Sequence, residues 1–457
     1  MPYLPNTPED QQAMLSAIGA GSLDELFAQV PAELRLQRPL DLPPALTELE
    51  LTQHLGELAA RTASTADKVC FLGAGSYDHF IPAVVDAIAS RGEFYTSYTP
   101  YQPEASQGNL QAFFEYQTLI TQLTGLDVSN ASLYDGASAA AEAMLMTLAA
   151  TRRHGRLVVA RSVHPEYRQV LDTYLEHLGI ELVTVGASDG ALSPDDLAAA
   201  LNDQTAGVLV QQPNFFGCLE EMAELAEVTH RAGALFVAAV DPVSLGILKR
   251  PGDYGADIVV AEGQALGSPM SFGGPYLGIM ACREEFVRRM PGRITGQTVD
   301  RQGRRCWVLT LQTREQHIRR EKATSNICTN QGLFALRACV YLSVLGPHGL
   351  REVAELSLRK SHYAAERLAA IDGLSLEFSR PFFKEFAVRA PQGLVEPLLE
   401  HAYRDDGLLA GVPLGRWYPE LADCFLVTVT EKRVRSEIDR LAASLSEVSS
   451  LLASNHA

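Results

Sequence analysis

Short apolar runs separated by Gly and Pro turns fill the middle of the chain, and several are linked by amphipathic segments. Short β-branched runs bounded by turn residues are typical of buried strands, and apolar residues at helical spacing predict the helices between them. We expect strands at 157–160, 182–185, 208–211, 234–240, 257–261 and 276–280, and helices at 165–178 and 220–232. Repeated strand–helix units of this length predict an α/β fold, with a mostly parallel sheet covered on both faces.

The two ends of the chain have different patterns. The first 60 residues contain helix-capping signals at Thr7 and Ser22, then a proline-rich stretch and another helix. We expect the Arg-rich segment 291–331 to be irregular. After residue 331 we expect two helices to about 370, strands at 374–378, 385–389 and 424–429, and helices at 395–403 and 434–452. These patterns predict an N-terminal helical arm and linker (1–60), a large α/β domain (61–330) and a small α+β domain (331–457).

Two groups of residues near predicted strand ends could bind a ligand. Asp241 follows the run at 234–240, and open α/β sheets bind ligands at the carboxyl ends of their strands, although an Asp also starts turns. Gly136-Ala137-Ser138 opens an alanine-rich helix after a strand expected at 131–134. Small residues at a helix start let backbone N–H groups approach an anion, but they also serve close helix–sheet packing.

Composition narrows the function classes. The net charge of −17 disfavours nucleic acids and anionic membranes as partners. Seven scattered cysteines without a CxxC pair fit reduced thiols, and the absence of a secretory signal or an apolar run of ~18 residues predicts a cytoplasmic protein. A lysine-dependent mechanism has few choices, and none between 249 and 322; the lysines are Lys68, Lys249, Lys322, Lys360, Lys384 and Lys432.

Longer motifs carry a family resemblance. A large α/β domain followed by a small one resembles the fold-type I pyridoxal-phosphate enzymes. The segments FYTSYTPYQPEASQGNLQAFFEYQTLI, LYDGASAAAEA, GSPMSFGGPYLG and EKATSNICTNQ are similar to the glycine decarboxylase P-protein of the glycine cleavage system. At this length the chain resembles the N-terminal-half subunit, called subunit 1 or alpha, of split P-proteins. The resemblance implies decarboxylation of glycine and transfer of the aminomethyl group to the lipoyl arm of H-protein.

The resemblance also assigns positions around a cofactor pocket. It implies phosphate binding at Gly136, Ala137 and Ser138, ring stacking by His164, pyridinium pairing by Asp241 and the Schiff-base position at residue 264. Position 264 is glutamine here, and an amide cannot form the imine that tethers the cofactor. We therefore predict a pseudo-site at Gly136, Ala137, Ser138, His164, Asp241 and Gln264, with pyridoxal phosphate held by a Lys-bearing partner, subunit 2.

Active sites of fold-type I enzymes lie at subunit interfaces, so the resemblance implies that this chain lends residues to its partner. The candidates are loop residues for which an ordinary interface contact is an equally good explanation: Tyr95, Tyr98, Lys322, Thr324, Ser325 and Asn326. Two other interpretations stay open. One is a self-sufficient pyridoxal-phosphate enzyme of the desulfurase or aminotransferase type that uses another lysine, and the other is a regulatory protein derived from the fold.

Overall fold

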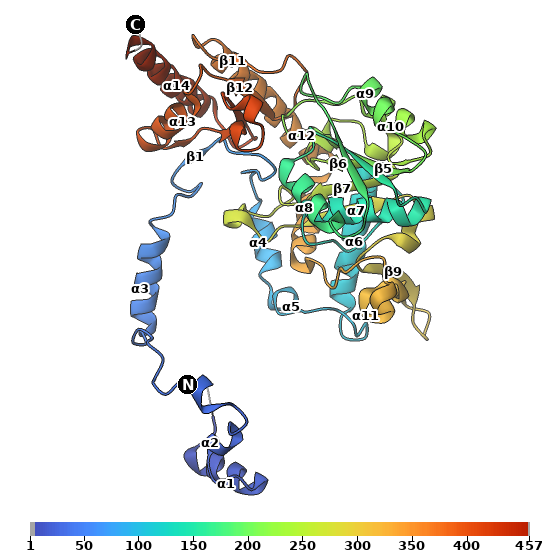
Figure 1. Cartoon of the computed structure of the whole chain (residues 1–457), viewed down its shortest axis with the longest axis vertical. Helices are drawn as coiled ribbons and strands as arrows, with labels where there is room; N and C mark the ends of the chain where they lie inside the picture. Colours follow the sequence, from blue (N-terminus) through green and yellow to red (C-terminus); the bar gives the residue numbers. More distant parts are fainter. Residues whose placement is uncertain (1–4, 456–457) are drawn as a thin grey trace. The chain divides into compact units, whose positions relative to one another are not determined.

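The computed structural model describes residues 5–455 in two units, one comprising residues up to 63 and the other residues from 64 onward. The first unit is helical and contains α1 (Pro8–Ile18), α2 (Leu23–Leu26), the short 3-10 helix η1 (Ala32–Leu34) and α3 (Glu48–Ala59) (Figure 1). Capping boxes at Thr7 and Thr47 fix the starts of α1 and α3. The capping bond expected from Ser22 is not formed, and Glu25 accepts the N–H of Gly21 instead, at 2.8 Å.

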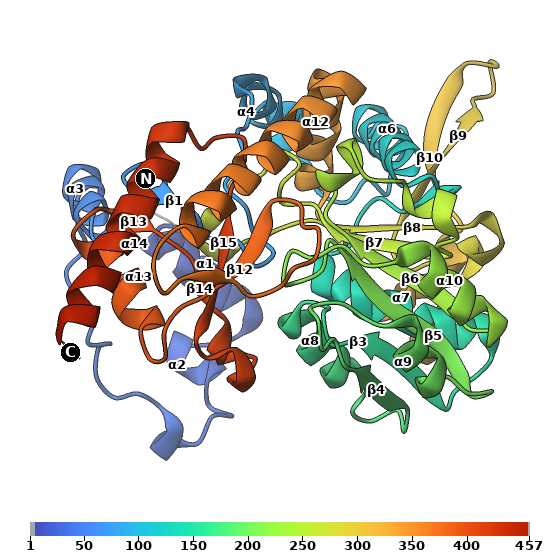
Figure 2. The same ribbon diagram turned by 90° about the horizontal axis from the view of Figure 1, so that it is seen from above.

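The second unit is built on a mixed sheet of seven strands in the order β2-β8-β7-β6-β5-β3-β4 (Figure 2). The strands are β2 (Val128–Ser129), β3 (Arg156–Ala160), β4 (Glu181–Val185), β5 (Thr205–Gln212), β6 (Leu235–Val240), β7 (Ile258–Glu262) and β8 (Gly278–Cys282). Strands β3 to β7 are parallel, whereas β8 runs antiparallel to both β7 and β2. The sheet is therefore mostly parallel, as the alternating pattern predicts.

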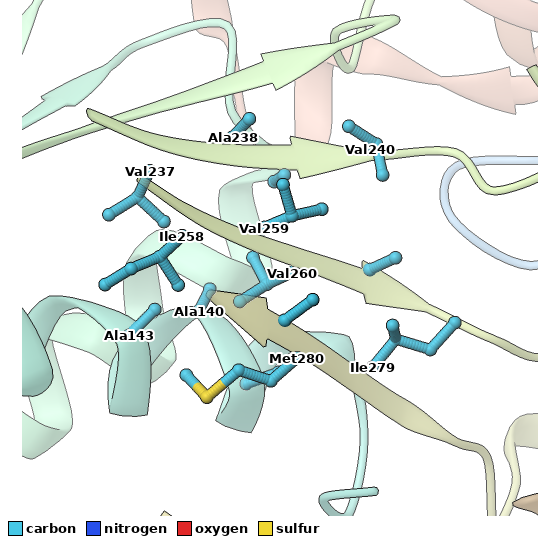
Figure 3. Close-up of a cluster of buried hydrophobic side chains, with 14 of the residues drawn as sticks. Ala140, Ala143, Val237, Ala238, Val240, Ile258, Val259, Val260, Ile279 and Met280 are labelled. Atoms are coloured by element: carbon cyan, nitrogen blue, oxygen red, sulfur yellow. The ribbon is translucent and has the colours of Figure 1, made fainter. Parts of the chain in front are cut away.

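The central strands are buried because both faces of the sheet are covered. Figure 3 shows Val237, Ile258 and Met280 from three neighbouring strands, close to Ala140 and Ala143 of helix α7 (Gly136–Thr151). All five side chains are buried. Small residues on α7 let the helix approach the sheet closely, and each buried Val or Ile contributes roughly 1.5–3 kcal/mol to folding. This packing holds α7 against the sheet, and the Gly136 N–H at the start of the helix donates to Glu262 at the end of β7.

Further helices complete the large part of this unit. They are α4 (Ala83–Ala89), α5 (Gly92–Tyr95), α6 (Gln107–Thr124), α8 (Pro165–Leu175), α9 (Pro194–Ala200), α10 (Met222–Arg231) and α11 (Gln316–Arg319), with 3-10 helices η2 (Ser244–Gly246), η3 (Pro251–Tyr254), η4 (Ser271–Gly273), η5 (Glu284–Arg289), η6 (Gln312–Arg314) and η7 (Arg320–Lys322).

Two local predictions are wrong in this part of the chain. The segment 291–331, expected to be irregular, contains the antiparallel hairpin β9 (Ile294–Val299) and β10 (Arg305–Thr310). The segment 131–134, expected to be a strand, forms only an isolated bridge from Leu133 to Gly278. Ser132 has a φ of 98°, which takes the backbone out of the extended conformation that a strand needs.

A smaller antiparallel sheet has the order β11-β12-β15-β14, formed by β11 (Ser375–Leu376), β12 (Glu385–Arg389), β15 (Cys424–Thr428) and β14 (Val412–Pro413). Its neighbours are α13 (Val395–Arg404), α14 (Arg435–Asn455), the 3-10 helices η8 (Leu414–Arg416) and η9 (Pro419–Leu421), and the parallel pair β1 (Val69–Cys70) and β13 (Leu408–Leu409). Phe71, which follows β1, is fully buried in the core that includes this sheet.

The long helix α12 (Gly332–Ala369) connects the two sheets in sequence. Gly346 breaks it with a φ of 58°, and Pro347 follows, so it consists of two helical stretches as the sequence predicts. Among the helices described in residues 5–455, α12 has the length and hydropathy of a membrane span. Its buried residues, which include Ala335, Ala338 and Leu342, belong to the hydrophobic core, so α12 is a core helix.

Candidate functional site

The ends of β6 and β7 and the start of α7 meet at one edge of the large sheet. Asp241 follows β6, Glu262 ends β7, and both line a cavity of about 40 Å³ together with His164. A cavity of this size has room for only a few water molecules. Ala137, at the start of α7, lines an adjoining and wider cavity of about 460 Å³, which shares His164 and Glu262 with the first. Of the sequence-predicted positions, His164 and Asp241 line the small cavity, and Ala137 and His164 line the wider one. Gly136, Ser138 and Gln264 line neither cavity.

Lys384 forms an ion pair with Asp241 in the small cavity. Its Nζ lies 2.7 Å from Asp241 Oδ2, and its side chain is 2% exposed. The ammonium also lies 3.5 Å from the centre of the Tyr77 ring, in cation–π geometry. Sequence reasoning missed this contact because Lys384 and Asp241 lie far apart along the chain. The available signal was the charged pair Lys384-Glu385 set among the phenylalanines at 382, 383 and 386.

The ion pair extends into a buried network. Lys384 Nζ lies 2.9 Å from His79 Nε2, and His79 Nδ1 lies 2.6 Å from Glu431 Oε2. Since the ammonium can only donate, Nε2 accepts and Nδ1 carries the proton donated to Glu431. Burial works to raise the pKa of Glu431, but the interactions with His79 and the Phe80 N–H outweigh burial and lower it. The network links the end of β6 to the small sheet's side of the unit.

Gln264 is a fully hydrogen-bonded structural side chain. Its Oε1 accepts the Tyr77 N–H at 2.9 Å, and its Nε2 donates to Tyr77 O at 3.1 Å and to Ser268 O at 2.7 Å. The residue is 1% exposed. A glutamine supplies one acceptor and two donors in this geometry, and a lysine would supply donors alone. Gln264 therefore holds the Tyr77 backbone inside the pocket.

Glu262 places a carboxyl group at the start of α7. The Glu262 carboxylate accepts N–H groups from Gly136 at 2.9 Å, Gln264 at 2.9 Å and Leu277 at 3.0 Å. Burial raises the pKa of Glu262 to about 7. A Cβ added at Gly136 would lie 2.0 Å from the Tyr167 hydroxyl, so this position has no room for a side chain. The adjacent Ser138 N–H is donated to Asp135 at 2.7 Å.

The ring of His164 makes two hydrogen bonds and one stacking contact within the chain. Nδ1 accepts the Glu166 N–H at 3.1 Å, and Nε2 donates to Ala74 O at 2.8 Å. One face stacks on Tyr167, with ring centres 5.0 Å apart and an interplanar angle of 24°. Burial lowers the pKa of His164, which favours the neutral ring that these two hydrogen bonds require.

These contacts decide whether the pocket fits pyridoxal phosphate. Lys384 pairs with the carboxylate of Asp241, Glu262 and Asp135 accept the N–H groups of Gly136 and Ser138, and Gln264 fixes the backbone of Tyr77, which lines the small cavity. The Asp241 carboxylate and the N–H groups of Gly136 and Ser138, which the resemblance assigns to the cofactor, are thus engaged within this chain. With Gln264 at the Schiff-base position and Asp241 paired with Lys384, the residues present do not fit a covalently tethered cofactor. Within residues 5–455 no three His, Cys, Asp or Glu side chains are placed to hold a metal ion.

The interface candidates form a second region. Tyr95 and Tyr98 are 68% and 88% exposed, and they line a cavity of about 120 Å³ together with Thr329 and Asn330. The other candidates lie nearby in sequence but do not line this cavity; Lys322, Thr324 and Asn326 are exposed and Ser325 is half-buried. The structure therefore brings segment 94–101, the early tyrosine loop, against residues 329–330, the end of the later loop (322–330).

Comparisons with known proteins agree with this architecture. The family model described as Glycine cleavage system P-protein matches residues 1–445. A relative from Desulfitobacterium hafniense, named probable glycine dehydrogenase (decarboxylating) subunit 1, is 51% identical over 98% of this chain and 100% of its own length. A relative of the same name from Carboxydothermus hydrogenoformans is 54% identical over 97% of this chain and 99% of its own length.

Solved structures confirm the fold class. A crystal structure of glycine decarboxylase (P-protein) of the glycine cleavage system, in inhibitor-bound form, has a TM-score of 0.90 and 47% identity over 98% of this chain and 100% of that chain. A sphingosine-1-phosphate lyase from Burkholderia pseudomallei, 14% identical over 92% of this chain and 94% of that one with a TM-score of 0.65, shares the fold alone. The fold is thus that of fold-type I pyridoxal-phosphate enzymes, and the chain belongs to the glycine cleavage system P-protein family, among relatives named subunit 1.

Proposed function

We propose that this chain is the subunit of glycine decarboxylase that does not tether the cofactor. Together with a Lys-bearing subunit 2 it decarboxylates glycine and transfers the aminomethyl group to the lipoyl arm of H-protein. Pyridoxal phosphate supplies the electron sink for the decarboxylation, and we assign it to the partner subunit. The relatives' name, subunit 1, supports the existence of such a partner.

The observation that carries this proposal is the Asp241–Lys384 ion pair beside Gln264. A self-sufficient enzyme would need one lysine as a tether and a free strand-end carboxylate for the pyridine nitrogen. Lys384 is the lysine that reaches this pocket, and its Nζ is 2.7 Å from that same carboxylate. It cannot leave the carboxylate without breaking a buried ion pair, which costs several kcal/mol. The geometry therefore favours the two-subunit function over the self-sufficient enzyme.

We assign to this chain the support of the partner's site across the subunit interface. Tyr95 and Tyr98 offer exposed hydroxyls and rings, and aromatic side chains are enriched at interface cores. The later loop offers Thr324, Ser325 and Asn326 as hydrogen-bonding groups, placed by this proposal near the partner's cofactor phosphate. Lys322 adds positive charge on the same loop.

The test compares the chain alone with the assembled complex. The purified chain is incubated with pyridoxal phosphate, reduced with borohydride and searched for labelled peptides by mass spectrometry. Glycine-dependent exchange of CO2 is then assayed for the chain, for subunit 2 and for the mixture, each with lipoylated H-protein. We expect label on subunit 2 alone and activity in the mixture alone. Label on this chain, or glycine turnover by it unaided, would contradict the proposal, and failure to bind subunit 2 would favour a regulatory protein.

A further inference from the structure

Arg293 is a buried cation without a carboxylate partner. It immediately precedes β9 and is 2% exposed. Within the described part of the chain, 5–455, no Asp or Glu oxygen lies within ion-pair distance of its guanidinium, and its Nε donates to no acceptor. Desolvating a charge without a counter-ion is unfavourable, and buried charges are usually paired. Such a residue therefore needs an explanation beyond packing.

The hydrogen bonds of Arg293 join two loops that are far apart in sequence. Nη2 donates to the Tyr101 hydroxyl at 3.1 Å and to Cys328 O at 2.8 Å. Nη1 donates to Thr329 Oγ1 and Asn330 Oδ1, both at 3.2 Å. The guanidinium also lies over the Tyr101 ring, 5.4 Å from its centre. All four acceptors are neutral, so one planar cation holds the early tyrosine loop and the later loop together.

Supporting contacts hold the later loop in the same place. Asn330 Nδ2 donates to Ala131 O at 2.7 Å, and the Gln331 N–H donates to Ser132 Oγ at 3.0 Å. The backbone of Arg293 is itself fixed, because its carbonyl accepts the Ala131 N–H at 2.7 Å. Because the backbone of Arg293 is fixed, the planar guanidinium holds its acceptors on the two loops at a set distance from each other. Lysine carries the same charge but lacks the planar fork, so it cannot make the same set of bonds.

Two acceptors of Arg293 line the cavity that Tyr95 and Tyr98 also line. We propose that Arg293 is a positioning residue for the glycine decarboxylase reaction: it sets the distance between the segments 94–101 and 324–330, so that both meet the partner subunit as one pre-formed surface. The inference rests on the proposed function, because that function assigns both segments to the partner's active site. Arg293 is buried and acts through these loops, without touching the reacting groups.

Hydrogen–deuterium exchange on the full chain tests the positioning step without the partner. In Arg293→Met we expect amide exchange to rise at least about ten-fold in both 94–101 and 324–330. The matched control is Arg153→Met, because Arg153 also donates to neutral oxygens, Thr205 O at 2.8 Å and Ala232 O at 2.9 Å. The control should leave both loops at the wild-type exchange rate. Wild-type exchange of both loops in Arg293→Met would overturn the proposal.

Activity of the assembled complex tests the link to function. We expect Arg293→Met and Arg293→Lys to lower kcat/KM for glycine about ten- to hundred-fold, because small misplacements of active-site groups cost rates of that order. The control variant should keep the wild-type kcat/KM, and both Arg293 variants should still bind subunit 2. Loosened loops with wild-type kcat/KM would overturn the functional link.

A gentler variant covers the case in which Arg293→Met fails to fold. Tyr101→Phe removes one acceptor and keeps the ring, so exchange should rise in 94–101 and stay unchanged in 324–330. Wild-type exchange and activity in both Tyr101→Phe and Arg293→Lys would overturn the proposal. If the wild-type mixture shows no glycine turnover, the proposed function fails, and the exchange experiment still decides whether Arg293 orders the two loops.

Discussion

At the scale of single residues, the charged groups of the central pocket are paired with one another within the chain. Asp241, Lys384 and His79 form a continuous run of contacts from a strand end to a buried imidazole. An isolated carboxylate or ammonium in such a place would be strongly destabilising, whereas the pair is tolerated because each ion compensates the other. The pocket therefore depends on both members of the pair being present.

The first prediction concerns this pair. Lys384→Met removes the ammonium and leaves Asp241 buried without a counter-ion, so we expect the free energy of unfolding to fall by about 3–5 kcal/mol. The measurement is urea denaturation followed by circular dichroism. The double variant Lys384→Met/Asp241→Asn removes both charges and should recover more than half of the loss. A single variant as stable as wild type would show that the ion pair does not form in solution.

The second prediction concerns the Schiff-base position. In Gln264→Lys the new side chain cannot accept the Tyr77 N–H, and Asp241 is already paired with Lys384. We therefore expect neither covalent pyridoxal phosphate after borohydride reduction nor glycine-dependent CO2 exchange by the chain alone. Gln264→Met, of similar length and without an amine, is the control for stability. Labelling of the Gln264→Lys variant together with recovered exchange would show that the lysine was the single missing element.

Residues whose roles follow from neighbours in sequence could be predicted, and those that act across the fold could not. Asp241 and Gln264 follow predicted strands, so their position at the edge of the sheet is visible in the pattern. Lys384 and Arg293 make contacts with residues more than a hundred positions away or on separate loops, and nothing in their local pattern names those partners. These long-range partners are apparent only in the folded chain.

At the scale of elements, contacts between residues distant in sequence also explain why the β9–β10 hairpin could not be predicted. Strand β10 buries Trp307 and Leu309 on alternate positions, but Arg301, Gly303 and Arg304 between β9 and β10 give the region the composition of a polar loop. The buried pair packs with Leu110 of α6, a contact distant in sequence. The strands of the large sheet were predictable because their apolar runs are continuous, and continuous runs need no knowledge of the partner.

The third prediction belongs to helix α7. Glu142 on this helix is 3% exposed, and burial raises its pKa to about 7, with a smaller opposing effect from a hydrogen bond to Ser325. The folded state therefore binds the proton more tightly than the unfolded state, whose pKa is near 4.5. The stability that Glu142 contributes is fully present below that value and is lost as the pH rises through about 7.

The measurement is the free energy of unfolding from pH 5 to pH 8 in urea. A shift from 4.5 to about 7 corresponds to about 3 kcal/mol, which sets the order of the expected decline from this group. Glu142→Gln keeps the shape and removes the titration, so its stability should decline less steeply over the same range. Glu262 shifts in the same direction and leaves a residual slope. Equal slopes in the variant and the wild type would contradict the assignment.

At the scale of the whole molecule, the chain has one unit with extensive hydrophobic cores and one without. The unit 64–457 contains all four hydrophobic clusters of buried residues described in the structure, whereas in residues 5–63 only Leu15 is a buried hydrophobic side chain. Helix α3 is 12 residues long, and isolated helices of that length are marginal in water. The capping box at Thr47 stabilises the start of α3, but we expect the helix to be stable only when it packs against another surface.

The last prediction follows from the face that α3 presents. Leu51, Leu55 and Leu58 recur at helical spacing on one side and are 45%, 53% and 44% exposed, while Gln53 and Glu57 lie on the opposite side. We expect the triple variant Leu51→Ser/Leu55→Ser/Leu58→Ser to weaken association with subunit 2 at least ten-fold, because it removes an apolar stripe that the chain's own arm leaves uncovered.

The association is measured by titrating labelled subunit 2, with Gln53→Ser/Glu57→Ser as the control on the other face of the helix. The unit 64–457 should keep its unfolding transition in all variants, since the altered residues contribute nothing to its cores. Unchanged affinity in the leucine variant would mean that the arm packs elsewhere, and the interface would then have to rest on the loops that Arg293 joins.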